Sequence, residues 1–230
     1  YDLAGKRVFV AGHRGMVGSA IVRRLQSENC TVLMVGRDKL DLRRQDAVDA
    51  WVQENRPQAV FIAAAKVGGI LANNNQPVDF LYDNVTSAVN VIHGCARIGV
   101  EKLVFLSSSC VYPKFAPQPM AEECLLTGAL EPTNQWYAIA KIAAMKLAEA
   151  YRKQDGRDFI SVMPTNLYGP NDNFDLTTSH VLPALIAKTH AAKIRGDESM
   201  EIWGSGSPRR EFLHVDDAAD AIVHVIKTYS

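Results

Sequence analysis

The chain has 230 residues, 25 Lys and Arg against 25 Asp and Glu, and 47% hydrophobic residues. This composition is typical of a soluble globular protein, and the balanced, interspersed charge argues against binding to nucleic acid or to an anionic membrane. The amino-terminal residues lack the apolar stretch of a signal peptide, and no apolar run reaches the roughly 18 residues of a membrane span. We therefore expect a cytoplasmic protein.

The four cysteines, Cys30, Cys95, Cys110 and Cys124, form no CxxC pair and no zinc-type spacing. Reduced thiols fit this pattern better than a disulfide framework, and we expect no metal site. The chain starts at Tyr1 rather than Met, and no strand follows its last predicted helix. We expect that the longer protein continues beyond Ser230.

Short apolar strands alternate with amphipathic helices along most of the chain. Strands are predicted at 7–11, 31–35, 59–64, 103–107, 159–163 and 201–203, and helices at 16–26, 46–54, 77–98, 135–153, 180–193 and 216–227. This alternation predicts an α/β fold with a doubly wound parallel sheet, whose ligands bind at the carboxyl ends of the strands. Residues 164–178, rich in Asn, Asp and Thr, are predicted to form a long functional loop.

The first predicted strand runs into the sequence GHRGMVG at 12–18 and then into a helix. Glycines at such a turn permit a tight bend and a close backbone approach to a pyrophosphate, and the helix N-terminus offers free N–H groups to the phosphates. The GxxGxxG spacing alone is a weak signal, because an ordinary strand-to-helix turn also uses glycine. Its place after the first strand of an alternating chain predicts a dinucleotide site.

The second predicted strand leads to Arg37, where an NAD-specific site usually has an acidic residue for the ribose 2′-OH. Arg37 cannot accept that hydrogen bond, but together with Arg14 it could clamp a 2′-phosphate. The alternative is that both arginines are solvated surface residues. We expect NADP(H) as the cofactor, with the small side chains at 63–65 lying against it or simply packing.

Tyr137 and Lys141 form a YxxxK pair near the start of a predicted helix, so they share one helix face. We expect the Lys141 ammonium to lower the pKa of the Tyr137 phenol, which could then act as acid and base on a carbonyl. Ser108, just after a predicted strand, could hydrogen-bond the same oxygen. An ordinary helix face and a Ser-rich turn are the alternative, but combined with the glycine loop these features predict a hydride-transfer site.

Six segments together resemble the extended short-chain dehydrogenase/reductases, whose members act on nucleotide sugars. The segments are AGHRGMVGSAI at 11–21, AAAKVGGI at 63–70, SSSCVYPK at 107–114, PTNQWYAIAK at 132–141, MPTNLYGPNDNF at 163–174 and WGSGSPRREFLHVDD at 203–217. Several of them are similar to members that epimerise C3 and C5 of GDP-4-keto-6-deoxy-D-mannose and then reduce C4 with NADPH to give GDP-L-fucose. The resemblance implies this reaction, a GDP-sugar substrate and a homodimer.

The resemblance also implies a role for individual residues. Ser108, Tyr137 and Lys141 match the reductase triad, and Cys110 and His180 match the acid–base pair for epimerisation. The implied cofactor contacts are Gly12, Arg14, Gly15, Met16, Val17, Gly18, Arg37, Asp41, Leu42, Ala63, Ala64, Ala65, Tyr137, Lys141, Pro164, Asn166, Leu167 and His180. The implied substrate contacts are Ser108, Ser109, Asn166, Lys188, Trp203 and Arg210. One departure is Ser107, where the family pattern has Gly.

On this basis we expect residues 1–165 to form an NADP-binding Rossmann-type domain. Residues 166–230 would belong mostly to a smaller substrate domain that is only partly present, with residues 214–230 returning to the first domain. Structural alternatives stay open for Cys110, as an inert buried thiol, and for His180, as a residue of a helix cap.

Two other functions are compatible with parts of the pattern. A 4-epimerase or 4,6-dehydratase of the same family shares the YxxxK pair, but a 4-epimerase generally retains NAD, and Arg37 argues against that. A module that senses NADP(H) without chemistry belongs to a different class. Such modules commonly lack the Tyr and Lys pair that this chain keeps.

Overall fold

A five-stranded parallel sheet forms the centre of the main body. The computed structural model describes residues 1–202 and 204–230. The strands are β1 (Arg7–Ala11), β2 (Thr31–Leu33), β3 (Ala59–Ile62), β4 (Lys102–Leu106) and β5 (Asp158–Val162), in the order β2-β1-β3-β4-β5. The register runs through Val8↔Ala59 and Val60↔Leu103, and every pair is parallel. The order reverses between β1 and β3, the place where such sheets open a ligand crevice.

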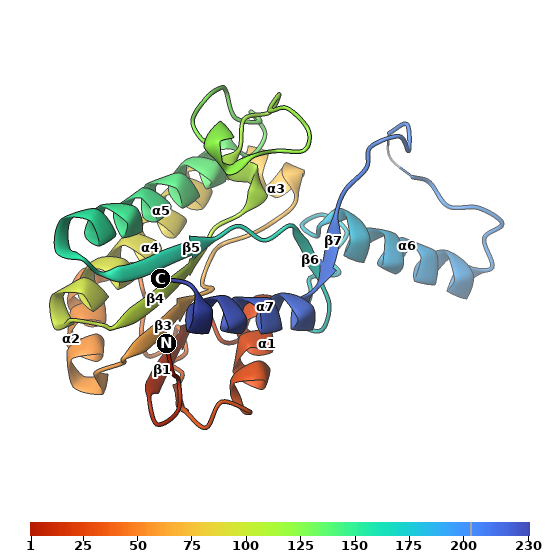
Figure 1. Ribbon diagram of the computed structural model, residues 1–230. Coiled ribbons are helices and arrows are strands. Elements are labelled where there is room, and N and C mark those ends of the chain that lie inside the picture. Colours follow the sequence, from red (N-terminus) through yellow and green to blue (C-terminus); the bar gives the residue numbers. More distant parts are fainter. Residues whose placement is uncertain (203) are drawn as a thin grey trace.

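Helices cover both faces of this sheet (Figure 1). One face carries α2 (Gln45–Asn55), α4 (Pro77–Ile98) and α5 (Gln135–Asp155), and the other carries α1 (Met16–Leu25) and α7 (Val215–Thr228). Side chains of β1 alternate between the two cores: Phe9 packs with α2 and α4, whereas Val8 and Val10 pack with α1 and α7. This double burial explains the continuous apolar strands, and it confirms the doubly wound α/β fold.

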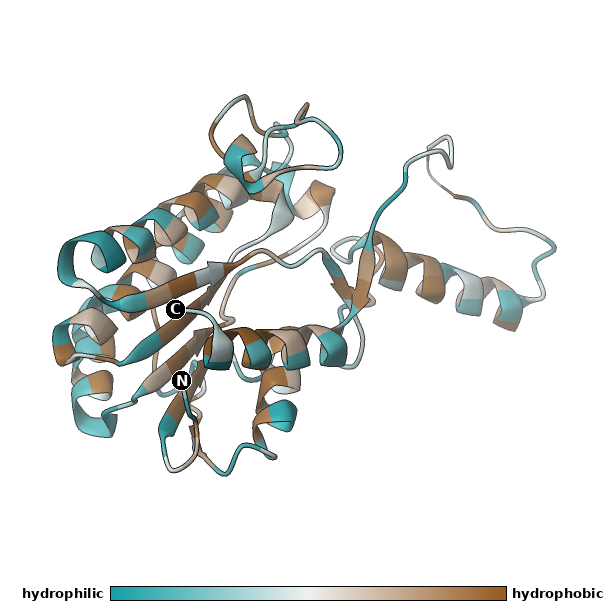
Figure 2. Cartoon of the chain, viewed as in Figure 1, coloured by the Kyte–Doolittle hydropathy of each residue, from teal (hydrophilic) through white to brown (hydrophobic). Residues whose placement is uncertain are grey.

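The longest helix, α4, has clear boundary signals in the sequence. Pro77 occupies its first turn, where no intrahelical N–H bond is lost, and Gly99 ends it in the left-handed conformation at φ 77°. In Figure 2 the strands and the inward helix faces are the most hydrophobic parts of the body. Within residues 1–202 and 204–230, no helix is both long and apolar enough to cross a membrane.

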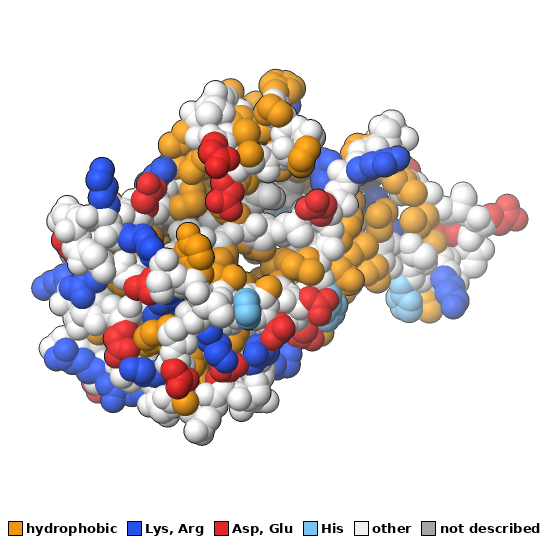
Figure 3. All heavy atoms as spheres, in the orientation of Figure 1, with side chains coloured by type: hydrophobic (Ala, Val, Ile, Leu, Met, Phe, Trp, Pro, Cys, Tyr) orange, Lys and Arg blue, Asp and Glu red, His pale blue; other side chains and the backbone are white. Residues whose placement is uncertain are grey.

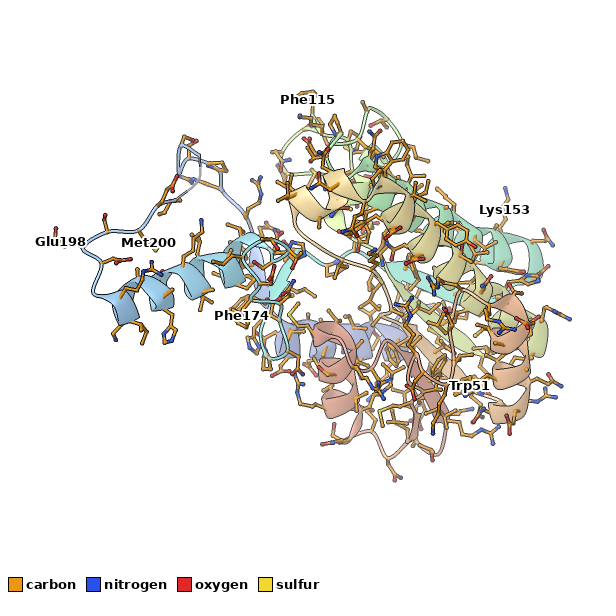
Figure 4. The ribbon with its side chains drawn as sticks, turned by 180° about the vertical axis from the view of Figure 1, so that it is seen from behind. Trp51, Phe115, Lys153, Phe174, Glu198 and Met200 are labelled. Atoms are coloured by element: carbon orange, nitrogen blue, oxygen red, sulfur yellow. The ribbon has the colours of Figure 1, made fainter. Side chains whose placement is uncertain are left out.

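A second, smaller part extends from the body. β6 (Asn166–Tyr168) and β7 (Phe212–His214) form a separate two-stranded parallel sheet, and α6 (Val181–Arg195) follows β6. Figure 1 shows α6 and the segment after it projecting away from the sheet, and in Figure 4 the labelled Glu198 and Met200 lie at the far end of this projection. Three short helices complete the chain, at α3 (Ile70–Asn75), η1 (Ser109–Val111) and η2 (Glu122–Cys124).

The structure corrects the sequence prediction at several short elements. The strand expected at 201–203 is wrong, because Glu201 and Ile202 are exposed and unpaired, while Trp203 lies outside the described residues. The strand that pairs with β6 is β7, and β6 itself lies inside the segment predicted as a loop. Helix α3 was not predicted. Three-residue strands and a six-residue helix leave too little periodicity to be recognised.

Candidate active site

A cleft of about 530 Å³ opens at the carboxyl ends of β1, β2 and β3. This volume lies within the range of small-molecule and cofactor pockets, and the position is the crevice expected for a doubly wound sheet. Of the predicted cofactor residues, the cleft is lined by Gly12, Arg14, Gly15, Arg37, Asp41, Leu42, Ala63, Ala64 and Ala65. One cleft therefore brings together the glycine loop, the arginines and the small residues after β3.

Gly12 cannot be replaced by a larger residue without moving the floor of this cleft. Its φ is +89°, and a Cβ there would lie 2.6 Å from the backbone nitrogen of Ala64. Gly18, in the first turn of α1, packs on the same loop, since its Cβ would lie 2.1 Å from the carbonyl oxygen of Gly12. The glycine trio thus sets close contacts between β1, α1 and the segment after β3.

Helix α1 begins at the cleft. Gly15 is its N-cap, and its amide donates a hydrogen bond to the carbonyl of Gly12 at 3.0 Å. The first turn includes Met16, Val17 and Gly18, and the N–H groups of a first turn have no acceptor within the helix. Together with the helix dipole, these donors favour an anionic group such as a pyrophosphate.

Arg14 and Arg37 lie together at the mouth of the cleft, beside the end of β2. Arg14 Nη1 lies 3.7 Å from Asp38 Oδ1, and both side chains are exposed. Such an exposed ion pair contributes at most about 1 kcal/mol, so it does not prevent Arg14 from binding a phosphate. Arg37 is also exposed and lines the same cleft. Both predicted arginines therefore line one cleft, where their guanidinium groups are available to an anionic ligand.

The cleft lining also includes four polar residues outside the segments that the sequence analysis singled out: Arg43, Asp83, Asn84 and Ser87. Arg43 donates to Asp41 at 2.6 Å and to Asp83 at 3.1 Å, and its hydrogen bonds lower the pKa of Asp41 to about 2. Asn90 of α4 also donates to the Leu42 carbonyl, at 2.9 Å. The polar residues Asp79, Asp83 and Ser87, four apart on α4, are the signal that could have identified this face.

Asn84 fixes the opposite wall of the cleft. This buried side chain accepts a hydrogen bond from the Lys66 amide at 2.7 Å and donates to the carbonyls of Lys66 and Phe80 at 2.9 and 2.7 Å. The Lys66 side chain forms a further ion pair with Asp79 at 2.5 Å. The segment after β3 is therefore attached to α4 through both its backbone and a side chain.

Ser108, Cys110, Tyr137 and Lys141 gather where β4 ends and α5 begins. The Ser108 hydroxyl accepts a hydrogen bond from the Cys110 amide at 3.4 Å. The Lys141 ammonium is buried, donates to the carbonyl of Leu106 at 2.7 Å, and lies 5.5 Å from the centre of the Tyr137 ring. Cys110 is close enough to interact electrostatically with both Tyr137 and Lys141. The four predicted residues are thus brought together.

The expectation that the pKa of Tyr137 is lowered is wrong, because burial outweighs the effect of Lys141. Burial raises the pKa of the Tyr137 phenol, with a further contribution from Cys110, and burial lowers the pKa of Lys141 to about 8. Burial also raises the pKa of the Cys110 thiol, against a smaller opposing effect of its hydrogen bond with Ser108. Spacing along a helix predicts which groups are neighbours, but not how strongly they are desolvated.

The remaining predicted site residues belong to the projecting part. Pro164 precedes β6 and Leu167 lies within it. In the same strand, Asn166 Nδ2 donates a hydrogen bond to the Glu211 carbonyl at 3.0 Å. Arg210 is exposed just before β7, and Lys188 lies on α6. Ser109 starts η1, next to Ser108.

His180 is the exposed N-cap of α6. Within residues 1–202 and 204–230, no hydrogen bond or ion pair joins its side chain to Cys110 or Tyr137. The structure therefore brings four of the five predicted catalytic residues into one cluster and leaves His180 on a neighbouring element. No group of three or more His, Cys, Asp or Glu side chains in the described part of the chain could hold a metal ion.

Comparison with known proteins agrees with this geometry. GDP-L-fucose synthase from Sinorhizobium fredii is 61% identical over 230 residues, which cover all of this chain and 73% of that protein. A GDP-L-fucose synthetase from Naegleria fowleri, solved with NADP bound, superposes with a TM-score of 0.87 at 34% identity, over 98% of this chain and 74% of that one. A GDP-mannoheptose C4 reductase from Campylobacter jejuni with NADP bound gives 0.89 at 36% identity, over 99% and 76% of the two chains.

The match to a protein family spans almost the whole chain. Residues 8–230 match the family described as NAD dependent epimerase/dehydratase, from the first strand to the last residue. The match includes the glycine loop, the cluster at the end of β4 and the projecting part. The chain therefore belongs to the NAD dependent epimerase/dehydratase family.

Proposed function

We propose that this chain catalyses the GDP-L-fucose synthase reaction, which epimerises C3 and C5 of GDP-4-keto-6-deoxy-D-mannose and then reduces C4. The observation that carries the proposal is the Ser108, Cys110, Tyr137 and Lys141 cluster beside a dinucleotide cleft, in a chain 61% identical to a GDP-L-fucose synthase. The direct test is to incubate the protein with that ketone and NADPH and to identify the product by NMR. Recovery of unchanged ketone would contradict the proposal.

NADP(H) is the cofactor that fits the cleft. The glycine loop and the start of α1 would hold its pyrophosphate, and Arg14 and Arg37 its 2′-phosphate. The small side chains of Ala63, Ala64 and Ala65 leave room for the cofactor to lie against the protein backbone. When bound, NADPH supplies the hydride for C4. The protein residues then orient the ketone and move the protons.

Tyr137 is suited to protonate the C4 oxygen during reduction. Its raised pKa keeps the phenol protonated at neutral pH, so a proton is available when the oxygen becomes negatively charged. We assign Ser108 the second hydrogen bond to that oxygen and Lys141 the task of fixing the geometry of Tyr137. Lys141 is itself held by the Leu106 carbonyl at the end of β4.

Epimerisation needs a different pair of groups. The C4 ketone acidifies the protons at C3 and C5, and the hydrogen bonds from Ser108 and Tyr137 stabilise the enolate that forms. Inversion requires a proton to leave one face of the sugar and to return to the other. We assign these two steps to Cys110 and His180, because a thiol and an imidazole are both able to give up and take back a proton.

The proposed division of the chain follows from its packing. We assign residues 1–165 to cofactor binding and residues 166–230 mostly to the substrate, with residues 214–230 returning to the first domain. The supporting contacts lie between α7 and α1, where Asp216 pairs with Arg23 and Asp220 with Arg24. Asn166, Lys188 and Arg210 in the projecting part are candidates to bind the GDP-sugar, whereas Trp203 lies outside the described residues.

We expect NADPH to be preferred over NADH by more than tenfold in kcat/KM, because each charge-assisted contact contributes roughly 1.5–3 kcal/mol. Arg37→Asp should remove most of this preference, because it should weaken the binding of NADPH far more than the binding of NADH. Lys39→Asp is the matched control, since this exposed residue makes the same charge change but lies outside the cleft lining. Steady-state kinetics with both cofactors measure the effect, and equal rates in the wild type would refute the cofactor assignment.

We expect Tyr137→Phe to lower the reduction rate by the roughly 10²–10⁴-fold associated with loss of a general acid, while NADPH affinity stays nearly unchanged. The phenyl ring preserves packing against Phe80, so the loss reports on the hydroxyl. Tyr82→Phe, at an exposed position of α4, is the control. Retention of more than about a tenth of the wild-type rate would exclude Tyr137 as the general acid.

Cys110→Ser should block the exchange of solvent deuterium into C3 and C5, because a hydroxyl is far less acidic than a thiol and cannot replace it as the base. His180→Asn should slow product formation and change the pattern of exchange, with cofactor binding retained. NMR of the sugar recovered from D₂O, with and without NADPH, measures both effects, and Cys124→Ser is the control. Full exchange at both carbons in Cys110→Ser would reassign the thiol to packing.

We also propose a second copy of this chain as a partner. The starts of α4 and α5 lie side by side, since Phe80 contacts the Tyr137 ring edge-on, and they expose Val78, Tyr82, Trp136 and Ile139. An apolar surface of this kind favours association. Tyr82→Glu should convert a dimer to monomers in sedimentation velocity, whereas Phe115→Glu, at the loop tip in Figure 4, should not. A monomeric wild type would disprove the proposal.

A further inference from the structure

A tight contact joins the main body to the projecting part, and the proposed function does not use it. We call it the seam: on one side lie Gly68 and Gly69, which precede α3, and on the other lies the turn at residues 173–179, which precedes α6. The Gly69 amide donates a hydrogen bond to the Thr178 carbonyl at 2.8 Å. In Figure 3 apolar side chains gather where the body meets the projecting part, and in Figure 4 Phe174 lies at the base of α6.

Gly69 is required here by close approach and not by backbone conformation. Its φ of −64° and ψ of 177° suit any residue. A Cβ at this position, however, would lie 2.6 Å from the backbone carbonyl oxygen of Ser179, closer than real Cβ atoms come to such an atom. Any side chain at position 69 must therefore push the turn away from the body. Position 68 differs, because the tight contacts of a Cβ there would be with the body, at 3.1 Å from the Ala72 Cβ and 3.2 Å from Phe80 Cζ, while the Thr178 oxygen of the turn would lie at an ordinary 3.7 Å.

Both sides of the seam are held firmly. On the body side, the buried Asn73 side chain donates to the carbonyls of Gly68 and Gly69 at 2.7 and 3.2 Å. On the other side, Asp175 Oδ1 accepts hydrogen bonds from the amides of Thr177 and Thr178, both at 3.0 Å, and from their two hydroxyls. The turn is thus a compact unit with its own hydrogen bonds.

This unit leads directly into a residue with a proposed catalytic role. Ser179 is followed by His180, whose backbone is extended at φ −76° and ψ 171° and whose carbonyl accepts the Ala184 amide at 3.0 Å. His180 therefore lies one residue from the atom that a Cβ at position 69 would displace. The seam thus links, through a backbone hydrogen bond, the element carrying His180 to the body carrying Cys110 and Tyr137.

We propose that Gly69 is a positioning residue for epimerisation: the close approach that only glycine permits at the seam sets the place of His180 relative to the Cys110 and Tyr137 cluster. This inference rests on the proposed role of His180 in proton exchange. The glycine loop, Arg14 and Arg37 lie on the body, as does Tyr137, so the main cofactor cleft and the proposed proton donor for reduction do not depend on the seam. The seam therefore predicts a variant that loses exchange and keeps the cofactor site.

The test compares Gly69→Ala with Gly68→Ala in the full chain. Gly69→Ala should lower kcat for deuterium exchange into C3 and C5 at least about tenfold, on the scale of a catalytic group displaced by an ångström. The Kd for NADPH should stay within about twofold, because the glycine loop and the arginines of the cofactor cleft lie on the body. Gly68→Ala adds the same methyl group to the same loop but presses on Ala72 and Phe80 of the body and not on the turn, so it should keep far more exchange than Gly69→Ala.

A double-mutant cycle shows whether the effect passes through His180. If Gly69→Ala acts by displacing the imidazole, the double variant with His180→Asn should be no slower than His180→Asn alone. Losses that multiply, or wild-type exchange in Gly69→Ala, would overturn the inference while leaving the proposed function intact. A wild-type protein that exchanges no deuterium would instead refute the proposed epimerase function, and the inference with it.

A second variant covers the case in which Gly69→Ala does not fold. Asp175 is exposed, and Asp175→Ala removes the four hydrogen bonds that Oδ1 accepts within the turn. The substitution changes no residue of the body. It should show the same selective loss of exchange and the same lack of additivity with His180→Asn. Exchange at the wild-type rate in Asp175→Ala would show that the geometry of the turn does not control His180, and would refute the inference.

Discussion

Burial on both faces is the constraint on which the rest of this structure depends. β3 and β4 are buried at every residue, and β1 at every residue but its first, because α2, α4 and α5 cover one face and α1 and α7 the other. Parallel ladders use the backbone groups within these strands, so polar chemistry can be placed only where strands end. The glycine loop after β1, the small residues after β3 and Ser108 after β4 all follow this rule, which puts the cofactor cleft and the proton-transfer cluster on one edge.

Helix α4 converts that edge into a defined site. Its side chains Asp83 and Asn90 hold the segment after β2, through Arg43 and the Leu42 carbonyl. Asn84 and Asp79 of the same helix hold the segment after β3, through the backbone and side chain of Lys66. Both walls of the cleft are therefore attached to one rigid element, whose own position is fixed by its packing against α2 and α5. A cleft of this kind is largely formed before a ligand enters it.

The parts that were predictable from sequence are those with a strong local signal. Five sheet strands and six helices followed from the alternation of apolar runs and amphipathic segments, and the glycine loop and the YxxxK pair located the cleft and the cluster. β6, β7 and α3 were missed because each is too short to show a period. The contacts of Arg43 and Asn84 depend on residues about 20 to 40 positions away, and only the folded chain shows such distances.

The sign of the Tyr137 pKa shift shows why neighbours alone do not determine chemistry. An ammonium near a phenol favours the phenolate, yet burial opposes any charge, and here burial is the larger effect for both groups. The Lys141 ammonium also donates its shortest hydrogen bond to a backbone carbonyl, so its charge is partly satisfied away from the phenol. A phenol kept neutral in this way can donate its proton. The acceptor is the ketone oxygen, which becomes basic only as it gains negative charge. In the proposed reduction, burial of the pair therefore keeps the phenol in the protonated state that the reaction needs first.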